Sequence, residues 1–290
     1  MDGLLIGGVL VGLWIAAKLK TGRPDGELVR RVHPYRRMMS FIMPERAEAT
    51  VFIDSEVAAE KLEYFLAQNP DLTMTHLLLG CVARAMEQNP RLNRFVAGRR
   101  IYQRRGIFAT FSMKRKKNIA EAKVAAVKLS LDPAESLVDL AARIDKKIRI
   151  NRSDQKTYAD REFALLDMLP RPLLGLAVWL VRWLDDHNLL PGWWMEGDDL
   201  YTSIFIANLG SLNMNPAYHH LFNYGTCPLF LTVGRIETRP VLRDGAVTTG
   251  RVLPLRWTFD ERIEDGLTAR GGLDALCAML ADPAATFGDG

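Results

Sequence analysis

The feature of this sequence that most restricts its fold is the succession of strand-like and helix-like segments between residues 49 and 280. Apolar residues at every second position are typical of half-buried strands, whereas apolar residues three or four positions apart are typical of helices. The strand-like segments are 49–55, 99–115, 123–131, 201–207, 228–235 and 251–259; the helix-like segments are 55–68, 76–88, one that opens at 132–133, 160–190 and 266–280. Because the order lacks the regular spacing of βαβ units, the sequence predicts an α/β domain with a mixed sheet.

Capping residues indicate where two of the helices begin. Asp54 or Ser55 is expected to cap the helix that follows the first strand, and Thr73 or Thr75 the helix that runs to Gln88. Gly and Pro residues between 22 and 26 are typical of a linker.

Composition excludes several classes of protein. The chain has 290 residues, 48% of them hydrophobic and 25% charged, which is ordinary for a globular protein and unlike a disordered, collagen-like or polytopic membrane chain. A chain of this length buries a large core without a metal or disulfide. The cysteines form no Cys-x-x-Cys pair, which argues against a zinc ribbon or redox motif and predicts buried thiols in a reducing compartment. They are Cys81, Cys227 and Cys277.

The net charge of +4 is concentrated in one stretch. Ten basic residues and no acidic ones lie between Arg91 and Lys117. Residues 99–115 within it are expected to form a β-hairpin turning at 104–106. Such a patch suits a phosphate group, an anionic membrane or nucleic acid, or is a solvated hairpin rim. Since no zinc finger, RNA-binding motif or phosphate loop accompanies it, we expect no nucleic-acid partner.

The first twenty residues form an apolar segment with its basic residues on the C-terminal side. Gly3 to Ala17 carries no charge and, as a helix, is about 22 Å long, short of a hydrocarbon core of about 30 Å. The lysines that follow extend this reach by snorkelling. We therefore expect residues 1–20 to be an N-terminal membrane-anchor helix, contacting lipid through 3–19. The positive-inside rule then puts the rest of the chain in the cytoplasm, on the inner face of the membrane. The alternatives are a terminal helix docked on protein and an interfacial helix.

Several short motifs occur along the chain in an order that is typical of one protein family. The two longest are Ile204–Gly210 (IFIANLG) and Phe259–Gly266 (FDERIEDG), with 232–234 (TVG) and 239–241 (RPV) between them. Earlier in the chain stand 91–93 (RLN) and 136–140 (SLVDL). With these motifs, the chain from about Pro34 to Leu280 resembles the catalytic domain of the dihydrolipoyl acyltransferases of 2-oxo acid dehydrogenase complexes, of which chloramphenicol acetyltransferase is a smaller cousin.

The resemblance implies a fold, an assembly and a chemistry. The fold is a chloramphenicol acetyltransferase-like two-layer sandwich with a mixed β-sheet, and the assembly is a homotrimer or a higher assembly of trimers with active sites between subunits. Coenzyme A or an acyl-CoA is the implied substrate, with no metal. In the family motif His-x-x-x-Asp-Gly, the His is the general base. A Ser in the strand before Asn-Leu-Gly donates a hydrogen bond to the oxyanion, and the Asp is structural and pairs with an Arg.

This chain keeps the frame of that motif and lacks both of its chemical groups. Asp265 and Gly266 match, but Glu261 stands at the His position and Ala207 at the Ser position. Loss of an oxyanion donor typically costs 10²–10³ in rate, and loss of a general base 10²–10⁴. Ordinary thioester transfer is therefore expected to be severely weakened.

Other side chains are candidates to replace the missing groups. Glu261 is either a base whose pKa is raised by burial or one half of a buried ion pair with an Arg. His219 and His220 either pair with it across a subunit interface or have a packing role. The remaining candidates are Asn208 and Ser211, as oxyanion donors, and Arg36 or Arg37, as the partner of Asp265.

Residues 160–200 are an apolar helical insertion relative to the family. Within it, 172–184 (PLLGLAVWLVRWL) is apolar nearly all round and too short to span a bilayer. Trp and Arg at its edges suit a membrane interface, so this helix either rests on the bilayer near the substrate channel or packs against a neighbouring subunit.

The sequence thus predicts an anchor (1–20), a linker (21–33), an acyltransferase-like catalytic domain (34–282) and a tail (283–290). We expect no lipoyl attachment, because no lipoyl domain precedes the catalytic region. Two functions fit. One is a membrane-associated acyltransferase that transfers or binds an acyl-CoA thioester at a trimer interface with its usual machinery replaced. The other is a non-catalytic pseudo-acyltransferase acting as a trimeric scaffold or accessory subunit.

Overall fold

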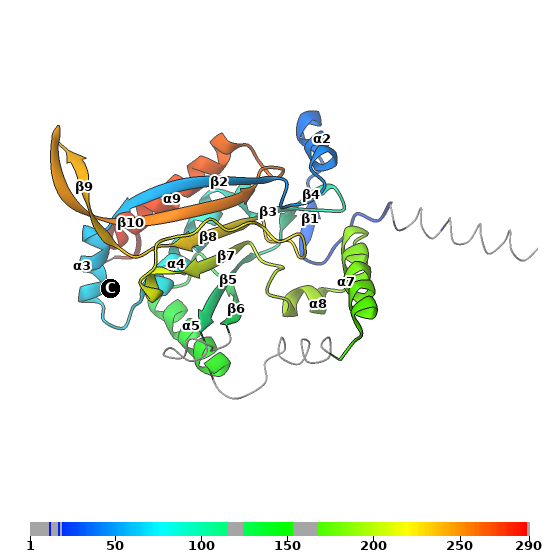
Figure 1. Ribbon diagram of the computed structural model, residues 1–290, viewed down its shortest axis with the longest axis horizontal. Helices are drawn as coiled ribbons and strands as arrows, with labels where there is room; N and C mark the ends of the chain where they lie inside the picture. Colours follow the sequence, from blue (N-terminus) through cyan, green and yellow to red (C-terminus); the bar gives the residue numbers. More distant parts are fainter. Residues whose placement is uncertain (1–11, 13–16, 18, 115–123, 153–167, 289–290) are drawn as a thin grey trace, which may run out of the picture.

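A seven-stranded mixed sheet forms the centre of the protein in a computed structural model that describes residues 12, 17, 19–114, 124–152 and 168–288 (Figure 1). Its strands follow the order β2-β10-β8-β7-β5-β6, and β9 pairs with β10. Their bounds are β2 Thr50–Ala58, β5 Ile107–Lys114, β6 Val124–Leu131, β7 Ile204–Asn208, β8 Leu229–Val233, β9 Glu237–Arg243 and β10 Ala246–Asp260. β7 runs parallel to β5 and β8, and the other pairs are antiparallel, so the predicted mixed sheet is confirmed.

Helices packed on the sheet complete the core. These are α3 (Glu60–Gln68), α4 (Met74–Gln88), α5 (Leu137–Arg152), α9 (Gly266–Ala281) and α10 (Pro283–Phe287). One continuous apolar cluster joins them to the sheet and includes Leu78 and Val82 of α4, Leu231 of β8, Trp257 of β10 and Leu273 of α9. α4 begins where the sequence predicts, since the Thr73 side chain accepts a hydrogen bond from the backbone N–H of His76.

A second sheet, of three strands, corrects the predicted hairpin. Its order is β1-β4-β3, with bounds β1 Gly26–Leu28, β3 Arg94–Ala97 and β4 Arg100–Arg104, and the short helix η1 (Pro90–Asn93) leads into it. β4 pairs with β1 and β3, whereas β5 joins the large sheet, so residues 99–115 do not form a hairpin. The chain changes sheets at Gly106, where φ is +74°, a value that favours glycine.

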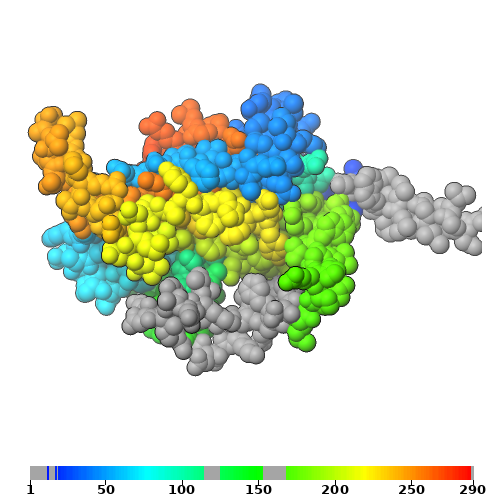
Figure 2. All heavy atoms as spheres, viewed as in Figure 1, coloured from blue at the N-terminus to red at the C-terminus, as the bar shows by residue number. Residues whose placement is uncertain are grey.

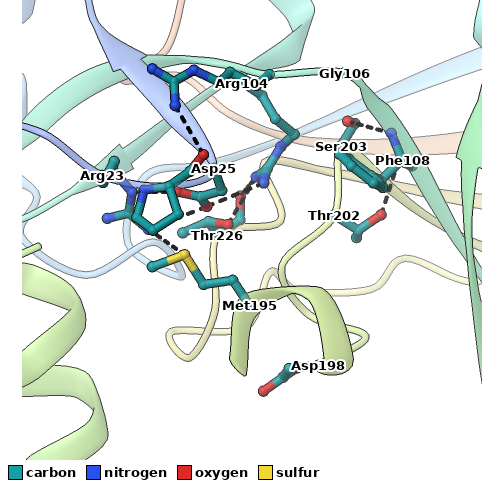
Figure 3. Close-up of polar contacts among 12 residues, drawn as sticks. Arg23, Asp25, Arg104, Gly106, Phe108, Met195, Asp198, Thr202, Ser203 and Thr226 are labelled. Atoms are coloured by element: carbon teal, nitrogen blue, oxygen red, sulfur yellow. Dashed lines mark hydrogen bonds and ion pairs between the residues drawn. The ribbon is translucent and has the colours of Figure 1, made fainter. Parts of the chain in front are cut away.

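The basic stretch is not simply a solvated rim. Arg104 is 5% exposed, and its Nη2 donates to the carbonyl and the hydroxyl of Thr226, both at 2.8 Å (Figure 3). Residues 115–117 of the stretch lie outside the described residues.

The segment expected to be a linker is built into the domain. Arg23 is buried and forms ion pairs with Asp25 at 2.6 Å and with Asp185 at 2.8 Å, and residues 26–28 form β1. The expected cap at Asp54 or Ser55 is also wrong, because β2 continues to Ala58 and α3 begins after Ala59. Strand β9 was not predicted.

The two ends of the elongated molecule differ. β9 and the start of β10 curl away at one end, and α2 (Pro34–Ile42) and α7 (Arg171–Asp186) lie at the other, with α8 (Gly192–Gly197) beside α7 (Figure 1). The expected anchor helix lies almost entirely outside the described residues. Within the part of the chain that the structure describes, no helix is both long and apolar enough to span a bilayer.

Candidate functional site

Glu261 lies on the turn between β10 and α9. Its backbone N–H donates to the carbonyl of Ala49 at 2.9 Å, and its own carbonyl accepts from Nη1 of Arg36 at 2.9 Å. The residue is half-buried. Among the described residues, its carboxylate has no hydrogen-bond or ion-pair partner, so the expected alternative of a buried ion pair with an Arg is not seen within the chain. The backbone of Glu261 is thus fixed by two hydrogen bonds, while its carboxylate bonds to no described residue.

The residues on either side of Glu261 anchor this turn. Nη2 of Arg262 lies 2.7 Å from Oδ2 of Asp260, and its Nη1 donates to the carbonyls of Met43 and Pro44. Nε of Arg46 lies 3.6 Å from the same oxygen of Asp260, and burial lowers the pKa of Arg46. Asp260 and Arg262 are therefore committed to structural ion pairing in the interior.

Asp265 and Gly266 open helix α9. The Asp265 carboxylate caps the helix by accepting from the backbone N–H of Thr268 at 2.8 Å, which lowers the pKa of Asp265, with a smaller contribution from Arg36. Nη2 of Arg36 lies 3.7 Å from Oδ2 of Asp265 and 3.7 Å from Oε1 of Glu264. Of the two candidate partners, Arg36 is thus the one beside Asp265, and Arg37 is exposed.

Ala207 lies on β7 beside Thr232 of β8, in register with it. The hydroxyl of Thr232 donates to the carbonyl of Ala217 at 2.5 Å. Asn208 and Ser211 bond to each other: the backbone N–H of Ser211 donates to Asn208 Oδ1 at 3.1 Å, and its hydroxyl donates to the Asn208 carbonyl at 2.7 Å. Asn208 and Ser211 therefore complete a local turn. Thr232, which the sequence motifs did not single out as a site residue, carries the hydroxyl on the strand next to Ala207.

His219 and His220 belong to an aromatic stack on the sheet. The His219 ring stacks on Phe230 at 4.0 Å between centroids, and Phe230 stacks on Phe205 at 5.0 Å. His219 Nδ1 contacts the carbonyl of His220 at 2.6 Å, and burial lowers the pKa of His219. Neither ring bonds to Glu261 within the described chain, so one protomer does not assemble the predicted His–Glu pair.

A buried polar cluster lies where β1, β4 and the end of α7 meet (Figure 3). Arg23 and Arg104 are its cations, and Asp25 and Asp185 its anions. Burial raises the pKa of Asp185 to about 6, against the opposing effect of Arg23. In the described ranges, no three His, Cys, Asp or Glu side chains are grouped in a way that suits a metal ion.

Comparison with known sequences supports the resemblance seen in the motifs. Residues 198–287 match the family described as 2-oxoacid dehydrogenases acyltransferase (catalytic domain). A stretch of 53 residues is 40% identical to the dihydrolipoyllysine-residue acetyltransferase component of the pyruvate dehydrogenase complex of Bacillus subtilis (strain 168). That stretch covers 18% of this chain and 12% of the Bacillus protein.

Solved structures share the fold. A probable dihydrolipoamide acetyltransferase from Listeria monocytogenes aligns with a TM-score of 0.55 at 18% identity, covering 88% of this chain and 94% of that one. The cubic core of the pyruvate dehydrogenase multienzyme complex gives 0.55 at 17% identity over 92% and 93%. Chloramphenicol acetyltransferase gives 0.52 at 13% over 88% and 99%. The chain therefore has the chloramphenicol acetyltransferase-like fold. Its residues 198–287 carry the sequence pattern of the 2-oxoacid dehydrogenase acyltransferase catalytic domain, and the predicted superfamily is confirmed.

Proposed function

We propose that this protein is a membrane-associated acyltransferase that binds an acyl-CoA thioester at the interface between three copies of the chain, with Glu261 as the base. The observation that carries the proposal is the position of Glu261. It stands four residues before Asp265 on a turn held by backbone hydrogen bonds, and its carboxylate has no partner among the described residues.

The proposed reaction exchanges one thioester for another. The carboxylate takes the proton of the attacking thiol, the sulfur bonds to the thioester carbonyl, and a tetrahedral oxyanion forms. Collapse of this intermediate breaks the original carbon–sulfur bond, and the departing thiolate takes the proton back. A free thiol has a pKa near 8.5 and a free Glu a pKa near 4.3, so Glu261 is a weak base for this step.

A second function, a non-catalytic trimeric scaffold or accessory subunit, is favoured by the surroundings of Ala207. Its methyl group offers no hydrogen bond to an oxyanion, and the Thr232 and Ser211 hydroxyls both donate to backbone carbonyls. A scaffold of this kind binds the thioester or a partner without turnover.

Membrane association rests on the apolar segment 3–19 and on α7. Leu173, Leu176 and Trp179 of α7 are each at least half exposed, and Trp193 of α8 is 63% exposed. An apolar surface with tryptophans at its edge suits the interfacial region of a bilayer. We infer that the domain lies on the cytoplasmic face, where it acts on a lipid-linked or long-chain acyl group.

The test combines binding with turnover. Titration calorimetry with acetyl-CoA and a long-chain acyl-CoA measures thioester binding, and exchange of the acyl group onto a free thiol measures catalysis. If Glu261 is the base, Glu261→Gln is expected to reduce turnover about 10²- to 10⁴-fold while binding persists. Glu87→Gln is the matched control, because Glu87 is exposed on α4. A wild-type chain that binds without turnover would support the scaffold. A chain that binds neither ligand would refute the acyltransferase and any scaffold that binds a thioester.

A further inference from the structure

Helix α2 turns its apolar side to solvent. Tyr35, Met38, Phe41 and Ile42 are between 59% and 64% exposed, whereas Ser40 on the opposite side is buried. We call these four residues the α2 stripe. A surface helix normally faces its apolar side to the core, and a contiguous exposed apolar patch marks a contact surface.

The α2 stripe is close to the candidate site. Arg36, between stripe residues 35 and 38, holds the Glu261 carbonyl and lies beside Asp265. Whatever covers the stripe is therefore one helix diameter, about 10 Å, from the turn that carries Glu261.

The stripe is also joined to α7. The guanidinium of Arg99, on the turn between β3 and β4, lies 5.1 Å from the centre of the Phe41 ring. The backbone N–H of Gly98 on that turn donates to Asp186 at the end of α7, and Arg182 of α7 pairs with Glu45 just after α2. Figure 2 shows the two helices, α2 in blue and α7 in green, at the same end of the molecule.

The chain enters the described domain at this same end. The carbonyl of Lys20 accepts from Nη1 of Arg100 at 3.1 Å and from Nδ2 of Asn188 at 2.8 Å. Asn188 is the second residue after the end of α7. The uncharged apolar segment 3–17 thus joins the described chain close to the end of α7.

The charges around the α2 stripe favour an anionic partner. Helix α2 contains no acidic residue, and Arg30, Arg31, Arg37 and Arg99 are exposed without an ion pair to any described residue. Arginines beside an apolar surface attract anionic headgroups. A two-fold contact between two copies of this face would instead bring like charges together, whereas the contacts within a trimer join two different faces.

We propose that the α2 stripe and α7 form one contact face for an anionic lipid bilayer, which holds the Glu261 turn next to the lipid. This inference rests on the membrane association in the proposed function and names its lipid class and contact residues. It also favours a long-chain acyl group as the substrate, because such a group would reach the site from the bilayer.

The test places a polarity-sensitive fluorophore on the full-length chain. Met38→Cys and Phe41→Cys are labelled separately in a Cys277→Ser background, since Cys81 and Cys227 are buried. Tyr64→Cys on α3 is the matched control, because Tyr64 is 68% exposed. Vesicles of phosphatidylcholine with phosphatidylglycerol, carrying spin-labelled lipids as quenchers, are compared with phosphatidylcholine vesicles alone.

We expect at least a twofold rise in emission and quenching by the spin-labelled lipids at 38 and 41, stronger with phosphatidylglycerol, and no change at 64. A second result is that the protein floats with the vesicles while the probes at 38 and 41 stay as accessible to aqueous iodide as the probe at 64. That result would overturn the contact face alone and leave membrane association standing. Failure to float would overturn membrane association as well. Protection that depends on protein concentration and not on lipid would mean that a second copy covers the stripe. None of these readouts depends on turnover.

Discussion

Nη1 of Arg36 donates a 2.9 Å hydrogen bond to the backbone carbonyl of Glu261, 225 residues further along the chain. The same guanidinium lies 3.7 Å from both Glu264 and Asp265. One side chain of α2 therefore positions the candidate base and the start of α9 together.

Arg36→Met is expected to destabilise the protein by about 2 kcal/mol, because it removes a charge-assisted hydrogen bond and leaves Glu264 with fewer cations. Denaturant unfolding followed by circular dichroism measures this change. Arg37→Met is the control, and it is expected to stay within about 0.5 kcal/mol of wild type since Arg37 is exposed. Equal effects of the two variants would show that the Arg36 contacts do not stabilise the turn.

Restoring the family's groups is expected to raise turnover. Glu261→His supplies a base of near-neutral pKa, and Ala207→Ser supplies an oxyanion donor. Typical effects are about 10²–10⁴ for a base and 10²–10³ for a donor, and they are not additive. Thiol-exchange assays on both single variants and the double variant measure the gain. A folded double variant no faster than wild type would mean that these positions do not face the thioester.

Arg23→Met is expected to cost about 3–5 kcal/mol, because it leaves Asp25 and Asp185 without the buried cation between them. Chemical unfolding measures the loss. Arg105→Met provides the comparison, since Arg105 is 55% exposed and its pair with Glu27 lies at the surface. A small effect at Arg23 would indicate that residues 21–33 contribute little to the fold.

The titration of Asp185 is expected to make the free energy of unfolding depend on pH. Burial raises the pKa of its carboxyl to about 6, from 3.8 for the ordinary group. The native state therefore binds this proton more tightly than the unfolded state does. The contribution of Asp185 to stability is fully present below about pH 4 and is lost as the pH rises through about 6.

Asp185→Asn removes that group from the titration. The difference in unfolding free energy between wild type and the variant, measured from pH 4 to pH 8, is expected to change in the variant's favour as the pH rises. A difference independent of pH would contradict the raised pKa.

Local periodicity in the sequence predicted the elements that depend on it. The strand expected at 123–131 is β6 over Val124–Leu131, and the helix expected at 266–280 is α9 over Gly266–Ala281. The spacing of Glu261 and Asp265, four residues apart on one turn, was likewise predictable from the sequence, because the spacing of residues within a turn is a local property.

Pairing between distant segments was not predictable in this way. Residues 99–115 have the pattern of a hairpin, yet β4 binds β1 and β3 while β5 joins another sheet. Residues 21–33 have the composition of a linker, yet Arg23 is buried against Asp185. In both cases the pairing partner lies far away in the sequence or in a different sheet. The local composition therefore does not indicate which segment it is.

The sequence by itself determined that an acidic residue, Glu261, stands four residues before Asp265 and that Arg36 or Arg37 is available for Asp265. Only the tertiary structure decided which arginine it is. Successive residues on an α-helix point about 100° apart, so the docking of α2 turns Arg36 toward Glu261 and leaves Arg37 in solvent.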